Sequence, residues 1–202
     1  MAEHGRIIFS GNGYAAAWVE EAAARGLSNY PSAAEAIPHL LDEKNVALFE
    51  RHGVYSRAEL AAVEEILLEN YCKQIHIDAS VVSEMVRRDI LPAVIGYGRE
   101  IAEAIDAKDR IAGYHRFPHR AENELLDKVS TLCDELSRRR AALDAALEKI
   151  DAIPSLTERA LAYRGIATEQ MPRVREVSDA LEDIVSKAAW PYPSYGNLLY
   201  RV

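Results

Sequence analysis

The chain has 202 residues, of which 49% are hydrophobic and 28% charged, so it can fold around a sizeable core and is not of disordered composition. Its formal net charge of −8 argues against nucleic acid as a partner, because binding to phosphates requires a basic surface. No apolar run approaches the roughly 18 residues that a membrane-spanning helix needs, and the N-terminus lacks the apolar core of a signal peptide. Since Ala, Glu, Leu and Arg dominate the middle and end of the chain, we expect a helix-rich cytoplasmic protein with no membrane partner.

The first segment, RIIFSGNGYAAAW, reads like the start of a nucleotide-binding domain. Residues 6–10 are apolar enough for a strand, a Gly-Asn-Gly turn follows at 11–13, and a helix is expected from Tyr14 to Arg25. The dinucleotide fingerprint works only inside a β-α-β unit, whose second strand ends in an acidic residue that holds the ribose. The sequence after Arg25, GLSNYPSAAEAI, cannot form that strand. We therefore interpret the segment as a strand that leaves a sheet edge through a glycine turn, and expect no bound dinucleotide.

Short helices are predicted next. SAAE (residues 32–35) and SRAE (residues 56–59) both match the capping box, in which a hydroxyl and a carboxylate satisfy free N–H groups at a helix start. Between them, residues 43–52 are expected to form a helix with Val46 and Phe49 on one side, ended by Gly53.

A long helix is predicted from residue 57 to about 110. Pro92 sits inside it and removes one hydrogen bond, so we expect a kink or a break there. The following AGYHRFPHR, residues 112–120, is predicted to be a loop. The apolar residues that recur at helical spacing are Leu60, Val63, Leu67, Tyr71, Ile77, Val81 and Met85.

A second long helix is predicted from about residue 122 to 152. Its apolar residues alternate four and three apart, as in the seam of a coiled-coil-like hairpin. Arg139 is the one misfit, and we expect it to pair with an acid or to extend out of the seam. Two of the three arginines at 138–140 are expected to face solvent. The seam positions are Leu125, Val129, Leu132, Leu136, Arg139, Leu143, Ala146 and Ile150.

A third long helix follows a turn at Pro154 and is predicted over about residues 156–188. Pro172 is expected to kink it. Its apolar stripe consists of Val174, Val177, Leu181 and Ile184.

These elements predict a mainly α fold in three parts. A short-helix N-terminal segment (1–56) precedes an elongated antiparallel helical bundle with long kinked helices (57–188). The last part, residues 189–202, is too rich in proline and aromatic residues to continue the helix. It is predicted to be an extended tail that docks by burying Trp190, Tyr192 and Tyr195.

The histidines do not form a recognisable metal site. His115 and His119 have a spacing that suits a metal on a helix, but Pro118 argues against a helix there, so we interpret them as loop histidines. No Glu-x-x-His occurs, which removes the usual di-iron signature of helical bundles. His76 is interpreted as a histidine at the edge of the bundle.

The two cysteines, Cys72 and Cys133, lie far apart, and we interpret them as free buried thiols of a reducing compartment. A disulfide or a nucleophilic thiol is the alternative, although no Cys/His pairing favours it. Glu64, Glu65 and Glu69 are interpreted as a solvated face. The residues alone thus predict a helical scaffold with no catalytic, cofactor-binding or metal-binding residue.

Several blocks of the chain carry a family resemblance that runs in order over nearly its whole length and is weakest at 120–170. They resemble the C-terminal region of type III glutamine synthetases, bacterial glutamate–ammonia ligases. One departure is the alanine triplet 15–17, where a Ser-Glu-Glu-like helix start would be expected, and it weakens the local cap. The blocks are RIIFSGNGYAAAWVEEAAARGL (6–27), EKNVALFERHGVYSRAEL (43–60), EILLENYCKQIHIDA (65–79), ILPAVIGY (90–97) and WPYPSYGNLLY (190–200).

The resemblance implies that ATP, glutamate, ammonia and divalent cations such as magnesium bind to a catalytic domain upstream. No catalytic, cofactor-binding or metal-binding residue is therefore carried over to this chain. We expect a detached C-terminal piece, with residues 1–5 as its start, that is folded, helical and inactive alone. In the family, this region would support structure and assembly, packing on its own catalytic domain and on neighbouring subunits of a ring-based homo-oligomer.

A cut upstream of Arg6 is expected to leave a strand edge and an apolar face at Ile7, Phe9 and Trp18 unpaired. Two alternatives remain open: a free-standing helical protein–protein interaction module, and a metal enzyme built within the bundle.

Overall fold

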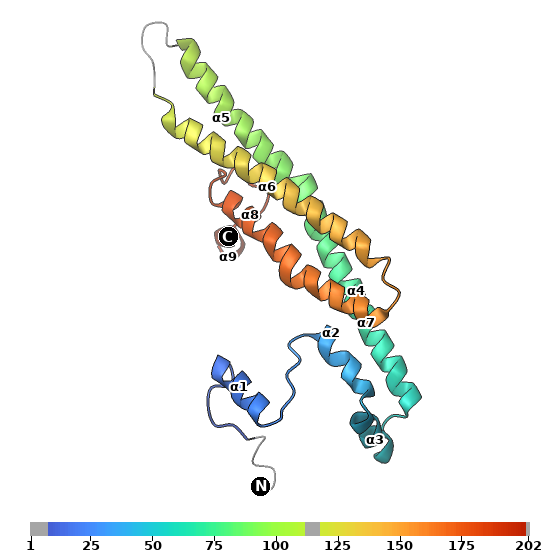
Figure 1. Cartoon of the computed structure of the whole chain (residues 1–202). Coiled ribbons are helices and arrows are strands. Elements are labelled where there is room, and N and C mark those ends of the chain that lie inside the picture. The colour runs from blue at the N-terminus through green and yellow to red at the C-terminus, as the bar shows by residue number, and fades with distance from the viewer. Residues whose placement is uncertain (1–7, 112–117, 201–202) are drawn as a thin grey trace. The chain divides into compact units, whose positions relative to one another are not determined.

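The computed structural model describes residues 8–111 and 118–200, apart from the side chain of Tyr195. The chain divides into two compact units, residues 1–68 and 69–202, and their boundary falls within helix α4 (Arg57–Met85). Figure 1 shows helices joined by turns and loops, and the described residues contain no strand. The mainly α fold class is thereby confirmed, whereas the division at residues 56 and 188 stays a prediction.

The predicted strand at residues 6–10 is wrong for the part that the structure describes, because residues 8–10 are irregular. A strand requires a neighbouring strand to satisfy its backbone groups, and the described chain offers none. Phe9 instead stacks on Trp18 of α1 (Ala16–Ala24), with ring centroids 4.0 Å apart. The Arg25 guanidinium lies over both rings and donates to the Ile8 carbonyl at 2.7 Å. The two rings expected to be unpaired thus cover one another, and Ile7 lies outside the described residues.

The glycine turn before α1 lies directly against the Phe9 ring of this aromatic stack. The Asn12 side-chain oxygen accepts a hydrogen bond from the Tyr14 N–H at 3.0 Å, which closes a local turn. A β-carbon on Gly11 would come within 2.5 Å of the Phe9 ring, so any other residue there would require the ring to move. The N-cap residue Ala15 makes no side-chain cap, as expected from the alanine triplet, and Gly26 ends the helix with φ of 75°.

The capping-box predictions are confirmed. Ser32 precedes α2 (Ala33–Ala36), and its hydroxyl accepts from the Glu35 N–H at 3.3 Å. The Ser56 N–H donates to the Glu59 carboxylate at 2.8 Å, and this bond lowers the pKa of Glu59. Between the two boxes lie the 3-10 helix η2 (Ile37–Leu41) and α3 (Glu43–Arg51), which ends at Gly53 with φ of 62°.

The two prolines inside long helices do not break them. Pro92 follows the π turn η3 (Val86–Ile90), which joins α4 to α5 (Leu91–Ile111). Pro172 follows the π turn η4 (Ile166–Gln170), which joins α7 (Leu156–Gly165) to α8 (Met171–Glu182). Proline lacks an N–H, and its ring would collide with the carbonyl four residues back, so a wider turn just before it accommodates the ring. The expected distortion therefore takes the form of a π turn two residues ahead of each proline.

Helix α6 (Arg120–Ile150) is central to the second unit. It runs antiparallel to α5 as the second arm of a hairpin and packs against α8 on its other side (Figure 1). The predicted seam is confirmed at four of its eight positions, Val129, Leu136, Leu143 and Ile150, while the other four are half-buried and Leu147, which was not predicted, is buried. The buried residues that accompany them are Val94 and Ile101 of α5 and Val174, Val177 and Leu181 of α8. Helix α8 ends at Glu182, six residues before the predicted end.

The apolar stripe predicted for the first long helix differs from the one that is buried. Along α4 the second unit buries Cys72 and Ala79, whereas Ile77 is 56% exposed and Val81 is also exposed. The helix carries apolar residues around most of its circumference, so spacing alone defines more than one stripe. The buried stripe is the one that meets the other helices of the bundle.

The C-terminal tail is extended only in part. Residues 190–194 are irregular, but α9 (Tyr195–Leu199) is a short helix capped by Ser194, so the prediction of a wholly extended tail is wrong. Trp190 and Tyr192 are half-buried, as predicted for a docked tail. The Tyr192 hydroxyl donates to Asp89 in η3 at 2.7 Å, and burial together with this carboxylate raises the pKa of Tyr192 to about 12. Among the described helices, none is long and apolar enough to cross a membrane.

Candidate functional site

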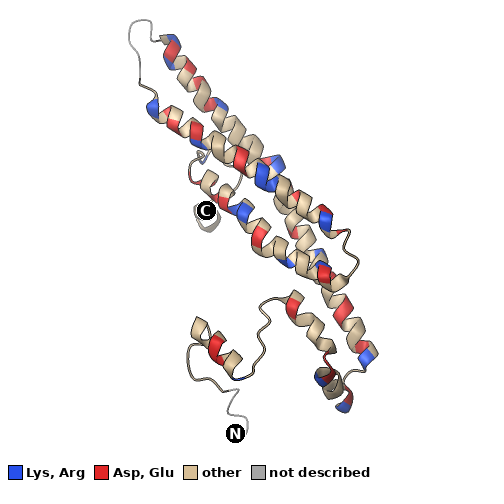
Figure 2. Cartoon of the chain, viewed as in Figure 1, with Lys and Arg blue, Asp and Glu red and all other residues tan. Residues whose placement is uncertain are grey.

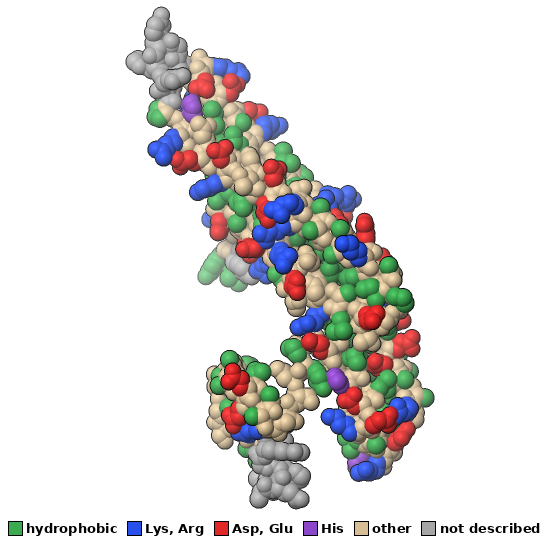
Figure 3. Space-filling model, viewed as in Figure 1, with side chains coloured by type: hydrophobic (Ala, Val, Ile, Leu, Met, Phe, Trp, Pro, Cys, Tyr) green, Lys and Arg blue, Asp and Glu red, His purple; other side chains and the backbone are tan. Residues whose placement is uncertain are grey.

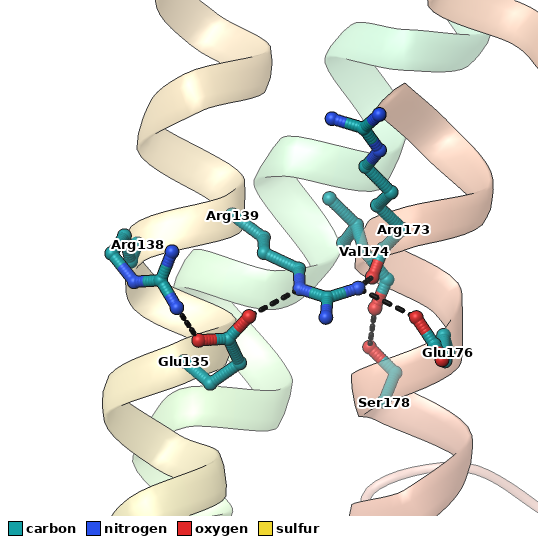
Figure 4. Close-up of polar contacts among 7 residues, drawn as sticks. All are labelled: Glu135, Arg138, Arg139, Arg173, Val174, Glu176 and Ser178. Carbon is teal, nitrogen blue, oxygen red and sulfur yellow. Dashed lines mark hydrogen bonds and ion pairs between the residues drawn. The ribbon is translucent and has the colours of Figure 1, made fainter. Parts of the chain in front are cut away.

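Arg139, the misfit in the apolar seam, links α6 to α8 (Figure 4). Its guanidinium donates to Glu135 on the same helix and, across to α8, to the Glu176 carboxylate at 2.7 Å and the Arg173 carbonyl at 2.8 Å. The prediction that Arg139 pairs with an acid is confirmed. A charged side chain is tolerated in the seam because these acceptors satisfy the guanidinium, and because the Arg139 side chain is still 26% exposed beside the exposed Glu176.

The expectation that two of the three consecutive arginines face solvent is wrong. Only Arg138, with 73% of its side chain exposed, does so, and it also contacts Glu135. Arg140 is mostly buried and binds Asp144 at 2.6 Å, which accepts a second hydrogen bond from Ser83 of α4. Residues two apart on a helix point in different directions, so Arg138 and Arg140 do not share one environment. The packing of other helices on α6 covers Arg139 and Arg140 and leaves Arg138 exposed to solvent.

A second polar site lies between α4 and α7 in the second unit. It is a pocket of about 380 Å³ whose wall combines titratable side chains with a few apolar ones. At its centre the His76 Nδ1 and the Tyr163 hydroxyl are 3.1 Å apart and share a hydrogen bond. The lining residues are Glu69, Cys72, Lys73, His76, Ile77, Asp151, Leu156, Arg159 and Tyr163.

Only some of the charged side chains in this pocket have an ion-pair partner among the described residues. Lys73 binds Glu69 at 2.8 Å, and this bond lowers the pKa of Glu69. Burial raises the pKa of the Cys72 thiol and of the Tyr163 hydroxyl, while the positive charge of Arg159 partly offsets both shifts. Cys72 is thus a protonated, buried thiol, and the pocket is not arranged to produce a reactive thiolate.

A third feature is an apolar groove of about 540 Å³ between the two π turns. Most of its wall consists of apolar side chains from η3, η4 and the helices beside them, and its polar lining residues are Arg175 and Ser178. The lining residues are Val82, Met85, Val86, Ile90, Ala167, Met171, Pro172, Val174, Arg175 and Ser178.

The remaining side chains singled out from the sequence are His119, His115 and the two cysteines. His119 lies 3.7 Å from Asp109, and His115 is outside the described residues. Both cysteines are free, with Cys72 buried and Cys133 half-buried. Among the described residues no group of three or more His, Cys, Asp or Glu side chains could hold a metal ion.

Arg159 and Tyr163 of the α4–α7 pocket were not identified from the sequence. The Tyr163 hydroxyl meets a histidine 87 positions earlier in the chain, and no local pattern marks such a pair. Only the packing of α7 on α4 brings them together.

Comparisons with known proteins all match this chain to glutamine synthetases. The profile of the glutamine synthetase C-terminal domain matches residues 1–109. The chain is 31% identical over 203 residues to a glutamine synthetase of Butyrivibrio fibrisolvens, covering 100% of this chain and 29% of that protein. It is 33% identical over 208 residues to the type-3 glutamine synthetase of Dictyostelium discoideum, covering 99% and 28%, and 26% identical over 196 residues to a glutamine synthetase of Bacteroides fragilis, covering 96% and 27%.

The chain therefore spans less than a third of the length of the curated relatives that it matches. The resemblance to type III enzymes inferred from the sequence blocks is confirmed by a relative of that name. The family profile covers more than half of the chain, and with these matches over nearly all of it, the chain belongs to the glutamine synthetase C-terminal domain family.

Proposed function

We propose that this domain serves the structure and assembly of a type III glutamine synthetase. The whole enzyme would make glutamine from glutamate, ammonia and ATP in the cytoplasm. The observation that carries the proposal is the match of nearly the entire chain to between 27 and 29% of each of three glutamine synthetases, together with the family profile of a C-terminal domain. This chain alone would be inactive.

The proposal assigns ATP and the divalent cations, such as magnesium, to the part of the enzyme that lies outside this chain. A few polar groups of the described residues link one helix to another, as a structural role requires. Arg139 joins α6 to α8, and Tyr192 joins the tail to η3. Such links hold neighbouring helices together, which is what a scaffold needs.

The surface of the second unit suits a domain that packs on other protein. Positive and negative side chains are interspersed along its helices (Figure 2), and apolar side chains are exposed between them (Figure 3). Ile77, Val81 and Ile95 are large apolar residues that remain exposed along α4 and α5. We propose that such surface is covered by the catalytic domain of the same chain or by neighbouring subunits of a ring-based homo-oligomer.

A truncation and replacement experiment tests the proposal. The C-terminal 29% of the Butyrivibrio fibrisolvens relative would be deleted, or replaced by this chain, and both products compared with the intact enzyme in size and ligase activity. We expect the deletion to lose the native oligomer and most activity, and the replacement to restore at least part of both. A deleted enzyme with native size and activity would contradict the proposal.

A further inference from the structure

Arg159 lines the α4–α7 pocket and is half-buried. Its Nε atom is buried and has no hydrogen-bond partner, and no ion pair of the guanidinium is found within the described part of the chain. Arg140 makes a useful comparison, because its Nε is equally buried but its Nη1 binds Asp144 at 2.6 Å. A buried polar group without a partner in the protein indicates that something else satisfies it.

The neighbouring carboxylates do not neutralise Arg159 by direct contact. Glu69, the carboxylate on the facing helix, is held by Lys73 at 2.8 Å. Arg159 nevertheless lines the same pocket as Glu69, Cys72 and Tyr163, and its positive charge acts to lower the pKa of each of them. The pocket thus contains a positive charge whose hydrogen-bond donors are not used by the protein.

The Tyr163 hydroxyl offers a second contact beside this charge. When the His76 Nδ1–H donates to the phenol oxygen, the phenol O–H is left to donate into the pocket. Ile77 and Leu156 are the apolar aliphatic side chains of the lining. At about 380 Å³ the pocket has the size of a site for a small molecule, not for a large cofactor.

We propose that this pocket binds a small molecule through an oxyanion group, a carboxylate or a phosphate, which Arg159 holds by charge-assisted hydrogen bonds and Tyr163 by its hydroxyl. Arginine presents its donors in a planar fork that matches both kinds of oxyanion. The apolar wall at Ile77 and Leu156 then covers the carbon part of the ligand. This inference concerns ligand binding and goes beyond the assembly role. Ile77 is exposed and belongs both to the pocket wall and to the apolar surface described above.

The test uses residues 1–202 and observes the Arg159 side chain directly. In a Cys133→Ser background, the Nε–H resonance of Arg159 would be followed by ¹⁵N NMR during separate titrations with inorganic phosphate and with propionate. We expect a saturable shift with at least one of the two, and whichever produces it identifies the source of the oxyanion. The same ligand should slow the reaction of Cys72 with a thiol reagent, because this thiol lines the pocket.

Two variants and one control separate binding from folding. Arg159→Gln should weaken binding at least about tenfold and Tyr163→Phe by a smaller factor, as expected from loss of a charged and of a neutral donor. Arg175→Gln, on exposed surface of α8 outside this pocket, should bind like the parent chain. Absence of a saturable shift with both probes, or equal binding by Arg159→Gln, would overturn the proposal. If Arg159→Gln does not fold, the titration and the Cys72 protection in the parent chain decide.

Discussion

Replacing Arg139 by alanine should destabilise the second unit by about 2 kcal/mol, whereas the same change at its neighbour Arg138 should cost less than about 0.5 kcal/mol. The two residues are adjacent and identical in type, but 26% of the Arg139 side chain is exposed and 73% of that of Arg138. Arg139 joins α6 to α8, while the ion pair of Arg138 found among the described residues is with Glu135 on its own helix. The pair therefore isolates the link between helices from the general effect of removing an arginine.

The magnitude follows from the three acceptors of Arg139. Glu176 has 72% of its side chain exposed, so that ion pair should contribute only about 0.5 kcal/mol. Glu135 keeps its contact to Arg138 after the substitution, which limits the loss there to about 0.5 kcal/mol. Loss of the bond to the Arg173 carbonyl and of the packed side-chain stem adds a further contribution of similar size, about 1 kcal/mol.

The assay is urea or thermal unfolding followed by circular dichroism, with both variants compared under the same conditions. A loss of about 2 kcal/mol should lower the midpoint temperature by roughly 4–8 °C. A double-mutant cycle of Arg139→Ala with Glu176→Ala should give a coupling of at most about 0.5 kcal/mol. Equal losses for Arg138→Ala and Arg139→Ala would refute the reasoning, because the contacts across to α8 would then carry no stability.

Three further predictions concern the core, the tail and the thiols. Leu136→Ala should cost about 2–5 kcal/mol because the side chain is 0% exposed, while Leu161→Ala, at 42% exposure, should cost less than about 1 kcal/mol in the same unfolding assay. Since the pKa of Tyr192 is raised from 10.0 to about 12, its contribution to stability should be present in full below pH 10 and be lost as the pH rises to about 12. Tyr192→Phe should abolish that alkaline dependence, and an unchanged profile in unfolding experiments across this range would disprove the assignment. Burial raises the pKa of Cys72 and Cys133, so both thiols should react slowly with a thiol reagent in the folded chain and fast in urea; a fast native phase would show an exposed thiol instead.

The parts of the fold that local chemistry determines could be predicted from the sequence. The seam of α6 has a single apolar stripe, so its spacing identifies the buried side without knowledge of the partner helices. The capping boxes before α2 and α4 depend on residues three apart and were predicted for the same reason.

The parts that depend on distant partners could not be predicted. The apolar residues at 7–9 suggest a strand, but a strand is stable only beside a second strand. Phe9 instead stacks on Trp18 of α1. Along α4 several stripes are apolar, and packing selected the one through Cys72 and Ala79. The α4–α7 pocket could not be predicted at all. No sequence pattern surrounds Arg159, and the pocket that it lines exists only because α7 packs against α4.

Glutamine formation by this chain alone is the measurement that tests the account most directly. Purified residues 1–202 would be incubated with glutamate, ammonia, ATP and magnesium, with the intact Butyrivibrio fibrisolvens relative as the positive control. A scaffold domain should fold into stable helices and form no glutamine above the blank without enzyme. Formation of glutamine that depends on both ATP and ammonia would show that the reaction centre lies within this chain, and the assignment of a purely structural role would be wrong.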